Sequence, residues 1–155
     1  MPICNPVDLE THLRPGERLI GLDVGTKTIG MALSDTRRMV ATPFDTIRRS
    51  RFRDDAARLL AEVERHGAGG VVLGLPLALD GDSPRTQGVR QFARNLLAYR
   101  DLPLAFWDER LSTAAVERAM IEADLSRRRR AELIDRAAAA YILQGFLDRM
   151  ARSVG

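Results

Sequence analysis

The sequence predicts an α/β fold in which a mixed sheet of five strands carries helices on both faces. Two observations support this prediction. Two strand-like segments follow each other closely near the start of the chain, and the apolar pattern then alternates between short continuous runs and helical spacing. An early hairpin followed by alternating strands and helices gives a mixed sheet, whose first, fourth and fifth strands are parallel.

The strands are predicted in order. Residues 18–24 and 28–34 are apolar segments joined by a short Gly-containing turn, as in a tight hairpin. A third run, near residues 39–47, contains Pro43, so we expect an irregular segment or an edge strand. The continuous apolar runs at residues 71–75 and 104–107 are typical of strands that are buried on both faces.

The helices follow from a change of period. Apolar residues recur every three or four positions over residues 52–63, and His66-Gly67 ends this helix. Ser83-Pro84 is a typical start for the next helix. Residues 111–123 and 131–150 predict two more. This order fits a ribonuclease-H-like sheet, whereas ferredoxin-like and flavodoxin-like folds need a helix between their first two strands.

Length and composition indicate one globular domain. The chain has 155 residues, of which 45% are hydrophobic and 29% charged. Residues 1–17 contain three prolines and no periodicity, so we expect an irregular N-terminal extension before a single domain over residues 18–155. There is no secretion signal and no apolar run near the roughly 20 residues that span a bilayer, which predicts a cytoplasmic protein without a membrane partner. A lone cysteine, Cys4, excludes an intrachain disulfide and a Cys-ligated metal site.

Asp23 is the most informative acidic residue. It lies inside an otherwise apolar predicted strand, where an uncompensated carboxylate is strongly unfavourable. Either a divalent cation or hydrogen bonds from the turn at Gly25-Thr26 must compensate it, and the spacing alone leaves both explanations open.

Two further acidic positions fall where a site is expected. Asp108 and Glu109 directly follow a predicted strand, and ligand sites in open α/β sheets gather at the carboxyl ends of parallel strands. Asp135 lies in the first turns of the last helix. The structural alternatives are a solvated turn at Asp108-Glu109 and a favourable interaction of Asp135 with the helix macrodipole.

Asp23, Glu109 and Asp135 together predict a site for a hard cation. Oxygen-only ligands suit Mg²⁺ or Mn²⁺, and neither His12 nor His66 is placed to favour zinc. One or two such ions activate a water and stabilise the leaving oxygen of a phosphodiester. The acids therefore predict a metal-dependent nuclease.

Four segments carry a family resemblance, in the same order along the chain. They are Gly21–Gly30, Val72–Leu77 with Asp80-Gly81, Asp108–Thr113, and Ile134–Leu143. These segments resemble the motifs of the YqgF (RuvX) family, and the match extends over about residues 18 to 150. That family comprises ribonuclease-H-like nucleases related to Holliday junction resolvases, with a cytoplasmic role in maturing pre-16S rRNA.

The resemblance implies a role for each matching residue. Asp23, Glu109 and Asp135 correspond to the metal-binding catalytic acids, and Asp108 to an additional ligand or an orienting residue. Backbone phosphate contacts are implied for Thr26, Lys27, Arg110 and Ser112. The four-arginine run before the last helix departs from relatives that often have lysines there. This run, Arg127, Arg128, Arg129 and Arg130, is either a solvated loop or a segment that holds a nucleic-acid strand.

The resemblance implies nucleic acid as the partner, namely the 5′ region of pre-16S rRNA, with the assembling small ribosomal subunit as a further partner. A resolvase acting on branched DNA stays open, because no residue separates RNA from DNA. The net charge of +3 does not decide the partner, and arginine-rich usage with Lys27 as the only lysine also fits a genome rich in G and C. Oligomeric state is open as well.

Two other classes of protein share part of this pattern. A non-catalytic RNA-binding assembly factor would not need three acids, yet all three are present. An ATP-binding protein of the actin type shares the Asp-x-Gly-Thr turn that begins at Asp23, but it needs a second similar domain, for which 155 residues leave no room.

Overall fold

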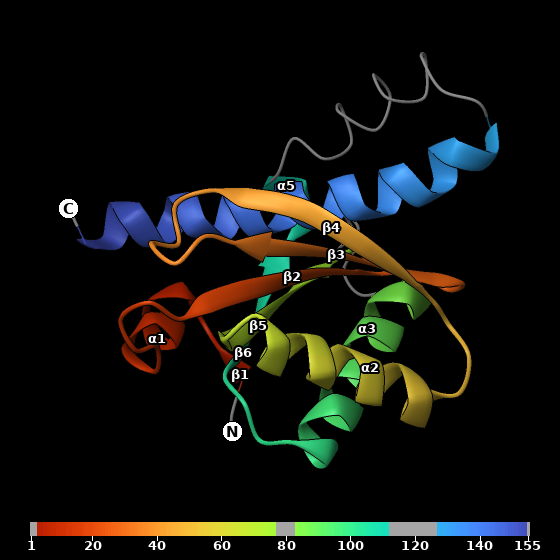
Figure 1. Cartoon of the computed structure of the whole chain (residues 1–155), viewed down its shortest axis with the longest axis horizontal. Helices are drawn as coiled ribbons and strands as arrows, with labels where there is room; N and C mark the ends of the chain where they lie inside the picture. The colour runs from red at the N-terminus through yellow and green to blue at the C-terminus, as the bar shows by residue number, and fades with distance from the viewer. Residues whose placement is uncertain (1–2, 77–82, 112–126, 155) are drawn as a thin grey trace.

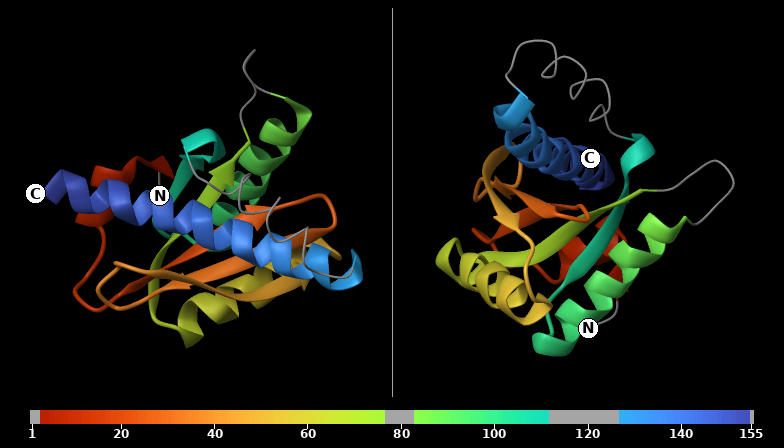
Figure 2. Two further views of the ribbon diagram at one scale, coloured as in Figure 1. Left: turned by 90° about the horizontal axis from the view of Figure 1, so that it is seen from above. Right: turned by 90° about the vertical axis from the view of Figure 1, so that its right-hand side faces the viewer.

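A six-stranded mixed sheet forms the centre of the molecule. The computed structural model describes residues 3–76, 83–111 and 127–154, without the side chains of residues 6, 7, 111, 127–135 and 152–154 (Figure 1). The strand order is β1-β6-β5-β2-β3-β4. Helices α2 and α3 cover one face, and α5 covers the other (Figures 1 and 2). The predicted α/β class with helices on both faces is confirmed, and the sheet has one strand more than predicted.

The bounds of the elements agree closely with the predicted segments. The strands are β1 (Ile3–Cys4), β2 (Arg18–Val24), β3 (Thr28–Ser34), β4 (Ala41–Arg48), β5 (Ala68–Leu75) and β6 (Leu104–Asp108). The helices are α1 (Pro6–Thr11), α2 (Phe52–Arg65), α3 (Pro84–Tyr99) and α5 (Arg127–Val154), with a 3₁₀ turn over Glu109–Leu111. The helix predicted over residues 111–123 falls outside the described residues from 112 onward.

Three parallel strands end at the same edge of the sheet. β2, β5 and β6 are mutually parallel, as predicted, with Leu22 opposite Leu73 and Leu75 opposite Asp108. β3 runs antiparallel to β2 through a tight turn, in which the backbone N–H of Gly25 donates to the carbonyl of Thr28 at 2.8 Å. The carboxyl ends of three parallel strands therefore lie together.

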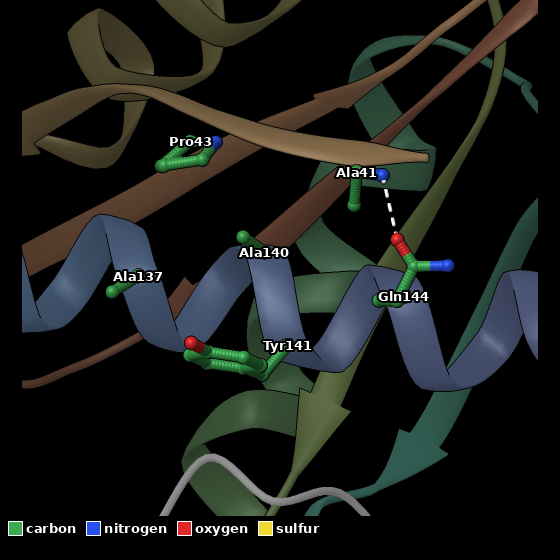
Figure 3. A pocket seen from close by; sticks show the side chains of 6 residues that line it. All are labelled: Ala41, Pro43, Ala137, Ala140, Tyr141 and Gln144. Atoms are coloured by element: carbon green, nitrogen blue, oxygen red, sulfur yellow. Dashed lines mark hydrogen bonds between the residues drawn. The ribbon is translucent and has the colours of Figure 1, made fainter. Parts of the chain in front are cut away.

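β4 is an edge strand, which is where Pro43 can be accommodated. Its start is held to α5 by the Gln144 side chain, whose Oε1 accepts from the backbone N–H of Ala41 at 2.8 Å (Figure 3). The Gln144 amide nitrogen donates to the carbonyl of Met39 at 2.9 Å. A hollow of about 200 Å³ lies between β4 and α5, and its described lining residues include no carboxylate.

Residues 1–17, predicted to be irregular, contain two short regular elements, β1 and α1. β1 pairs in parallel with β6, and α1 begins after Asn5, whose side chain accepts a hydrogen bond from the backbone of Asp8 at 2.9 Å. Leu9 is fully buried in the core beneath α5. A two-residue strand and a six-residue helix are too short to produce a readable period, so the pattern could not show them.

The last helix also starts earlier than predicted. α5 begins at Arg127 instead of Ala131, so the run Arg127–Arg130 forms its first turn and does not form a loop before it. Arginine is a good helix former, which explains why the helix continues through the charged run. Within the described residues, no helix combines the length and the apolarity needed to cross a membrane.

Two apolar cores stabilise the sheet, one on each face. On the α2 and α3 side, the core includes Ile20, Leu22, Leu59, Leu73 and Phe92. On the α5 side, it includes Leu9, Leu19, Trp107, Ile142 and Phe146.

Glycines let α5 approach the sheet closely. A Cβ at Gly21 would lie 2.7 Å from Cβ of Leu143, and a Cβ at Gly145 would lie 2.8 Å from Nε1 of Trp107. Any larger side chain at either position would push α5 away from the sheet. These contacts fix α5 along β2, with the amino end of the helix toward the carboxyl end of the strand (Figure 1).

Candidate functional site

Asp23 is a buried carboxylate at the carboxyl end of β2. Only 3% of the residue is exposed. Side chains alternate along a strand, so Asp23 shares the face of Gly21, which is the face covered by α5. Oδ1 of Asp23 lies 3.6 Å from Nη2 of Arg85, which forms an ion pair with it from the first turn of α3. The N–H of Gly25, one candidate donor for Asp23, is engaged in the hairpin turn.

Glu109 brings a second carboxylate to the same edge. It directly follows β6, and its Oε1 lies 2.8 Å from the point that a Cβ at Gly74 would occupy. Gly74 follows Leu73, which pairs with Leu22, so Gly74 is the β5 neighbour of Asp23. The Ile142 side chain of α5 also contacts this point. Asp23 and Glu109 thus approach the end of β5 from its two neighbouring strands, on the face that α5 covers.

Asp108 is engaged by Arg110. Oδ1 of Asp108 accepts hydrogen bonds from the backbone N and from Nε of Arg110, both at 3.0 Å, and Oδ2 accepts from Nη2 at 2.7 Å. These hydrogen bonds lower the pKa of Asp108 below its ordinary value and raise the pKa of Arg110. The pair orients Arg110 at the exposed rim of the site, which suits Asp108 to orienting more than to binding a cation.

Asp135 lies within α5, and its side chain is outside the described residues. Its backbone position is informative, because it precedes Ala139 by about one helical turn. The carbonyl oxygen of Ala139 lies 3.0 Å from the point of a Cβ at Gly21. Since α5 runs opposite to β2, the turn before Ala139 lies toward the strand end that carries Asp23 (Figure 1). Among the side chains that the structure describes, no group of three His, Cys, Asp or Glu could hold a metal ion.

The residues expected to bind phosphate fall into two groups. Thr26 and Lys27 are exposed in the β2–β3 turn, directly after the strand of Asp23, and Arg110 is exposed beside Glu109. Ser112 lies outside the described residues. For Arg127–Arg130, the structure describes the backbone alone, at the amino end of α5. The predicted contacts of all these residues with nucleic acid stay predictions.

Two arginines near the site were not anticipated from the sequence. Arg85 pairs with Asp23, and Arg49 donates from Nη1 to the carbonyl of Gly25 at 2.7 Å. The Ser83-Pro84 signal correctly predicted the start of α3, where Ser83 forms a capping box with Thr86. Both contacts join residues 24 or more positions apart, so no local pattern could have shown them.

Comparison with solved structures defines the class of protein. The fold resembles RuvC from T. thermophilus in complex with a Holliday junction substrate, with a TM-score of 0.56 and 15% sequence identity over 86% of this chain and 96% of that one. The Holliday junction resolvase of fowlpox virus is similar at a TM-score of 0.51 and 12% identity, covering 85% of this chain and 98% of that one. The chain thus has the ribonuclease-H-like fold of RuvC-type proteins.

Sequence comparison then gives the family. The family model described as "RuvX: Holliday junction resolvase" matches residues 17–149. A protein of Paramagnetospirillum magneticum is 60% identical over 149 residues, covering 96% of both chains, and one of Rhodospirillum rubrum is 56% identical over 154 residues, covering 98% of this chain and 96% of that one. Both carry the name "Putative pre-16S rRNA nuclease". The chain belongs to the RuvX family and is a nuclease.

Proposed function

We propose that this nuclease is a metal-dependent endonuclease that processes the 5′ end of pre-16S rRNA in the cytoplasm. The observation that carries the proposal is the convergence of Asp23, from β2, and Glu109, from the end of β6, on the two sides of β5 at one edge of the sheet. Relatives of 60% and 56% identity, named for pre-16S rRNA, supply the substrate. A buried acid next to a second acid is costly for the fold by itself, so the arrangement is best explained by a cationic ligand.

The described donors fit a hard divalent cation. Both acids offer oxygen, and the absence of a side chain at Gly74 leaves room for the Glu109 carboxylate over β5. Asp135 on α5 is the proposed third ligand, which gives an all-oxygen set suited to Mg²⁺ or Mn²⁺. When bound, the metal supplies an activated water and neutralises charge on the phosphodiester.

The protein's own side chains bind and orient the substrate in this proposal. Arg110, held by Asp108, offers its guanidinium at the rim, while Thr26, Lys27 and Ser112 contact neighbouring phosphates. The four arginines Arg127–Arg130 add positive charge to a helix amino end that is itself positive. Such an end attracts the phosphates of a nucleic-acid strand.

Cleavage of defined substrates tests the proposal. Wild type and Asp23→Asn are incubated with a 16S rRNA precursor that keeps its 5′ extension, in Mn²⁺, Mg²⁺ or chelator. Asp148→Asn is the matched control, since it makes the same change at an exposed position near the other end of α5. We expect metal-dependent cleavage by wild type and by the control, and none by a folded Asp23→Asn variant.

Two further substrates separate the alternatives. A four-way DNA junction is tested in parallel, because the family description names a Holliday junction resolvase, and cleavage of the junction alone would move the assignment to DNA. Assembling small ribosomal subunits are the third substrate. Precursor cleavage only within the subunit would identify it as a required partner, and cleavage of none of the three would favour the non-catalytic assembly factor.

A further inference from the structure

A pocket with a volume of about 330 Å³ opens beside the acids, between the β2–β3 turn and the first turns of α3. Gly25 and Thr26 of the turn form one wall, and Arg85 and Gly88 of α3 form the other. Arg49 closes a third side, at the end of β4. The pocket therefore lies at the carboxyl edge of the sheet, next to the strand end that carries Asp23.

The charge of the pocket is positive. Arg49 and Arg85 line it, and no carboxylate is among its described lining residues. Arg49 is held in place from two sides, by its hydrogen bond to the Gly25 carbonyl and by the Phe92 ring, whose centroid lies 5.5 Å from the guanidinium carbon. Because the Arg49 guanidinium is already held in place, it loses little conformational entropy when it binds an anion.

Arg85 connects the pocket to the acid site. It lines the pocket, and its Nη2 also lies 3.6 Å from Oδ1 of buried Asp23. With its side chain 46% exposed, Arg85 has room to turn from one side to the other. A cation bound to Asp23 would neutralise its charge and weaken its ion pair with Arg85. The planar guanidinium of Arg85 matches the geometry of a phosphate as well as that of a carboxylate.

Gly88 keeps the wall of the pocket open. A Cβ at this position would meet nothing within 4 Å. Glycine inside a helix costs about 1 kcal/mol relative to alanine, and packing gives no reason for it here. Open space in front of Gly88 is what a bound group would fill.

We propose that this pocket binds a backbone phosphate next to the scissile one, and that Arg85 moves from Asp23 to this phosphate when the strand binds. The proposal rests on the proposed function in one respect, namely that the nucleic-acid strand bound here is the substrate of the site formed by Asp23 and Glu109. Its ligand class is the phosphodiester of a single-stranded nucleic acid, so it does not depend on RNA or DNA being the natural substrate.

A double-mutant cycle in chelator, where no cleavage takes place, tests the exchange. Wild type, Asp23→Asn, Arg85→Gln and the double variant are titrated with a short fluorescent single-stranded RNA over a range of salt concentrations. Arg94→Gln is the matched control, because it removes the same charge from an exposed position further along α3. Thermal melts verify that each variant is folded.

We expect Arg85→Gln to weaken binding about tenfold and to reduce the salt slope by about 0.7, the contribution of one single-strand phosphate contact. The loss should be larger in the Asp23→Asn background, where Arg85 has no competing partner. If Arg85→Gln matches Arg94→Gln in affinity and slope in both backgrounds, the proposal is overturned.

Gly88→Leu provides a second variant that keeps both arginines but fills the pocket. We expect it to fold normally, because a side chain there meets open space, and to lose affinity like Arg85→Gln. Unchanged RNA affinity of folded Gly88→Leu would also overturn the proposal. These experiments measure binding and not cleavage. The phosphate contact can therefore be found in a protein that cuts no substrate, and it can be absent from a protein that cuts RNA, so the two proposals can fail separately.

Discussion

Oε1 of Glu109 lies 2.8 Å from the point where a Cβ at Gly74 would be. The carboxylate thus occupies space over β5 that exists only because residue 74 has no side chain. The Ile142 side chain presses on the same point from α5. One backbone position therefore controls both where the acid lies and how closely the last helix packs.

Gly74→Ala should displace the Glu109 carboxylate. We expect a loss of about 1–3 kcal/mol in the free energy of unfolding, and a fall in Mn²⁺ affinity of about tenfold or more. Calorimetric titration with Mn²⁺ measures the second effect. Gly70→Ala is the control on the same strand, since its Cβ would lie 3.1 Å from the Pro103 carbonyl, away from the acids. Equal Mn²⁺ affinities of the two variants would contradict the placement of Glu109 in the site.

Arg85→Gln should increase the response of the protein to metal. Without Arg85, the buried Asp23 carboxylate loses a positive neighbour, so the metal-free fold is weakened while the ligand itself is kept. We expect the Mn²⁺-induced rise in melting temperature to exceed that of wild type by about 2–4 °C, equivalent to about 1 kcal/mol. The measurement is thermal unfolding with and without Mn²⁺. An equal rise in both proteins would refute the expectation that Arg85 and the metal ion compete for Asp23.

Arg110→Gln should raise the pKa of Asp108 toward its ordinary value, because the hydrogen bonds from Arg110 are what lower it. A lowered pKa in the folded state stabilises the protein above the unfolded pKa of about 3.9. That stabilisation is lost as the pH falls through the lowered value. Carboxyl ¹³C NMR titration follows Asp108 directly, and Arg94→Gln should leave its curve unchanged. An unmoved curve in Arg110→Gln would count against the pairing.

Leu9→Ala should destabilise the whole domain, because Leu9 is fully buried against the α5 side of the sheet. We expect a loss of about 2–5 kcal/mol in urea unfolding. Val40→Ala, at a residue that is 58% exposed, should change stability by no more than about 0.5 kcal/mol. A comparably small effect of Leu9→Ala would mean that the N-terminal segment is dispensable for the fold.

The central strands and the pairing of the acids could be predicted from sequence for physical reasons. The β2 and β3 segments are long enough to show their pattern, and Ser83-Pro84 marks the start of α3 by its own capping chemistry. Asp23 and Glu109 could be placed at one edge because Asp23 lies near the end of β2 and Glu109 follows β6, and the carboxyl ends of parallel strands meet at one edge.

The remaining features depend on contacts that no local pattern encodes. α1 is held by the burial of Leu9 and not by a period of its own. The start of α5 was missed because a run of arginines has no apolar stripe, although it favours the helix. Arg85 and Asp23 are 62 positions apart in the sequence, so the position of Arg85 in a helix gave no sign of its partner.

Because α5 comes last in the chain, the proposed site cannot be complete until synthesis of the protein is nearly finished. One face of β2, β5 and β6 is covered by a helix that follows them in the chain, and Gly21 and Gly145 mark its close contacts. While the chain is still emerging from the ribosome, that face remains bare, and Asp135 has not yet joined Asp23 and Glu109. In the proposed site, therefore, a nascent chain could not cut the RNA around it before its last helix docks.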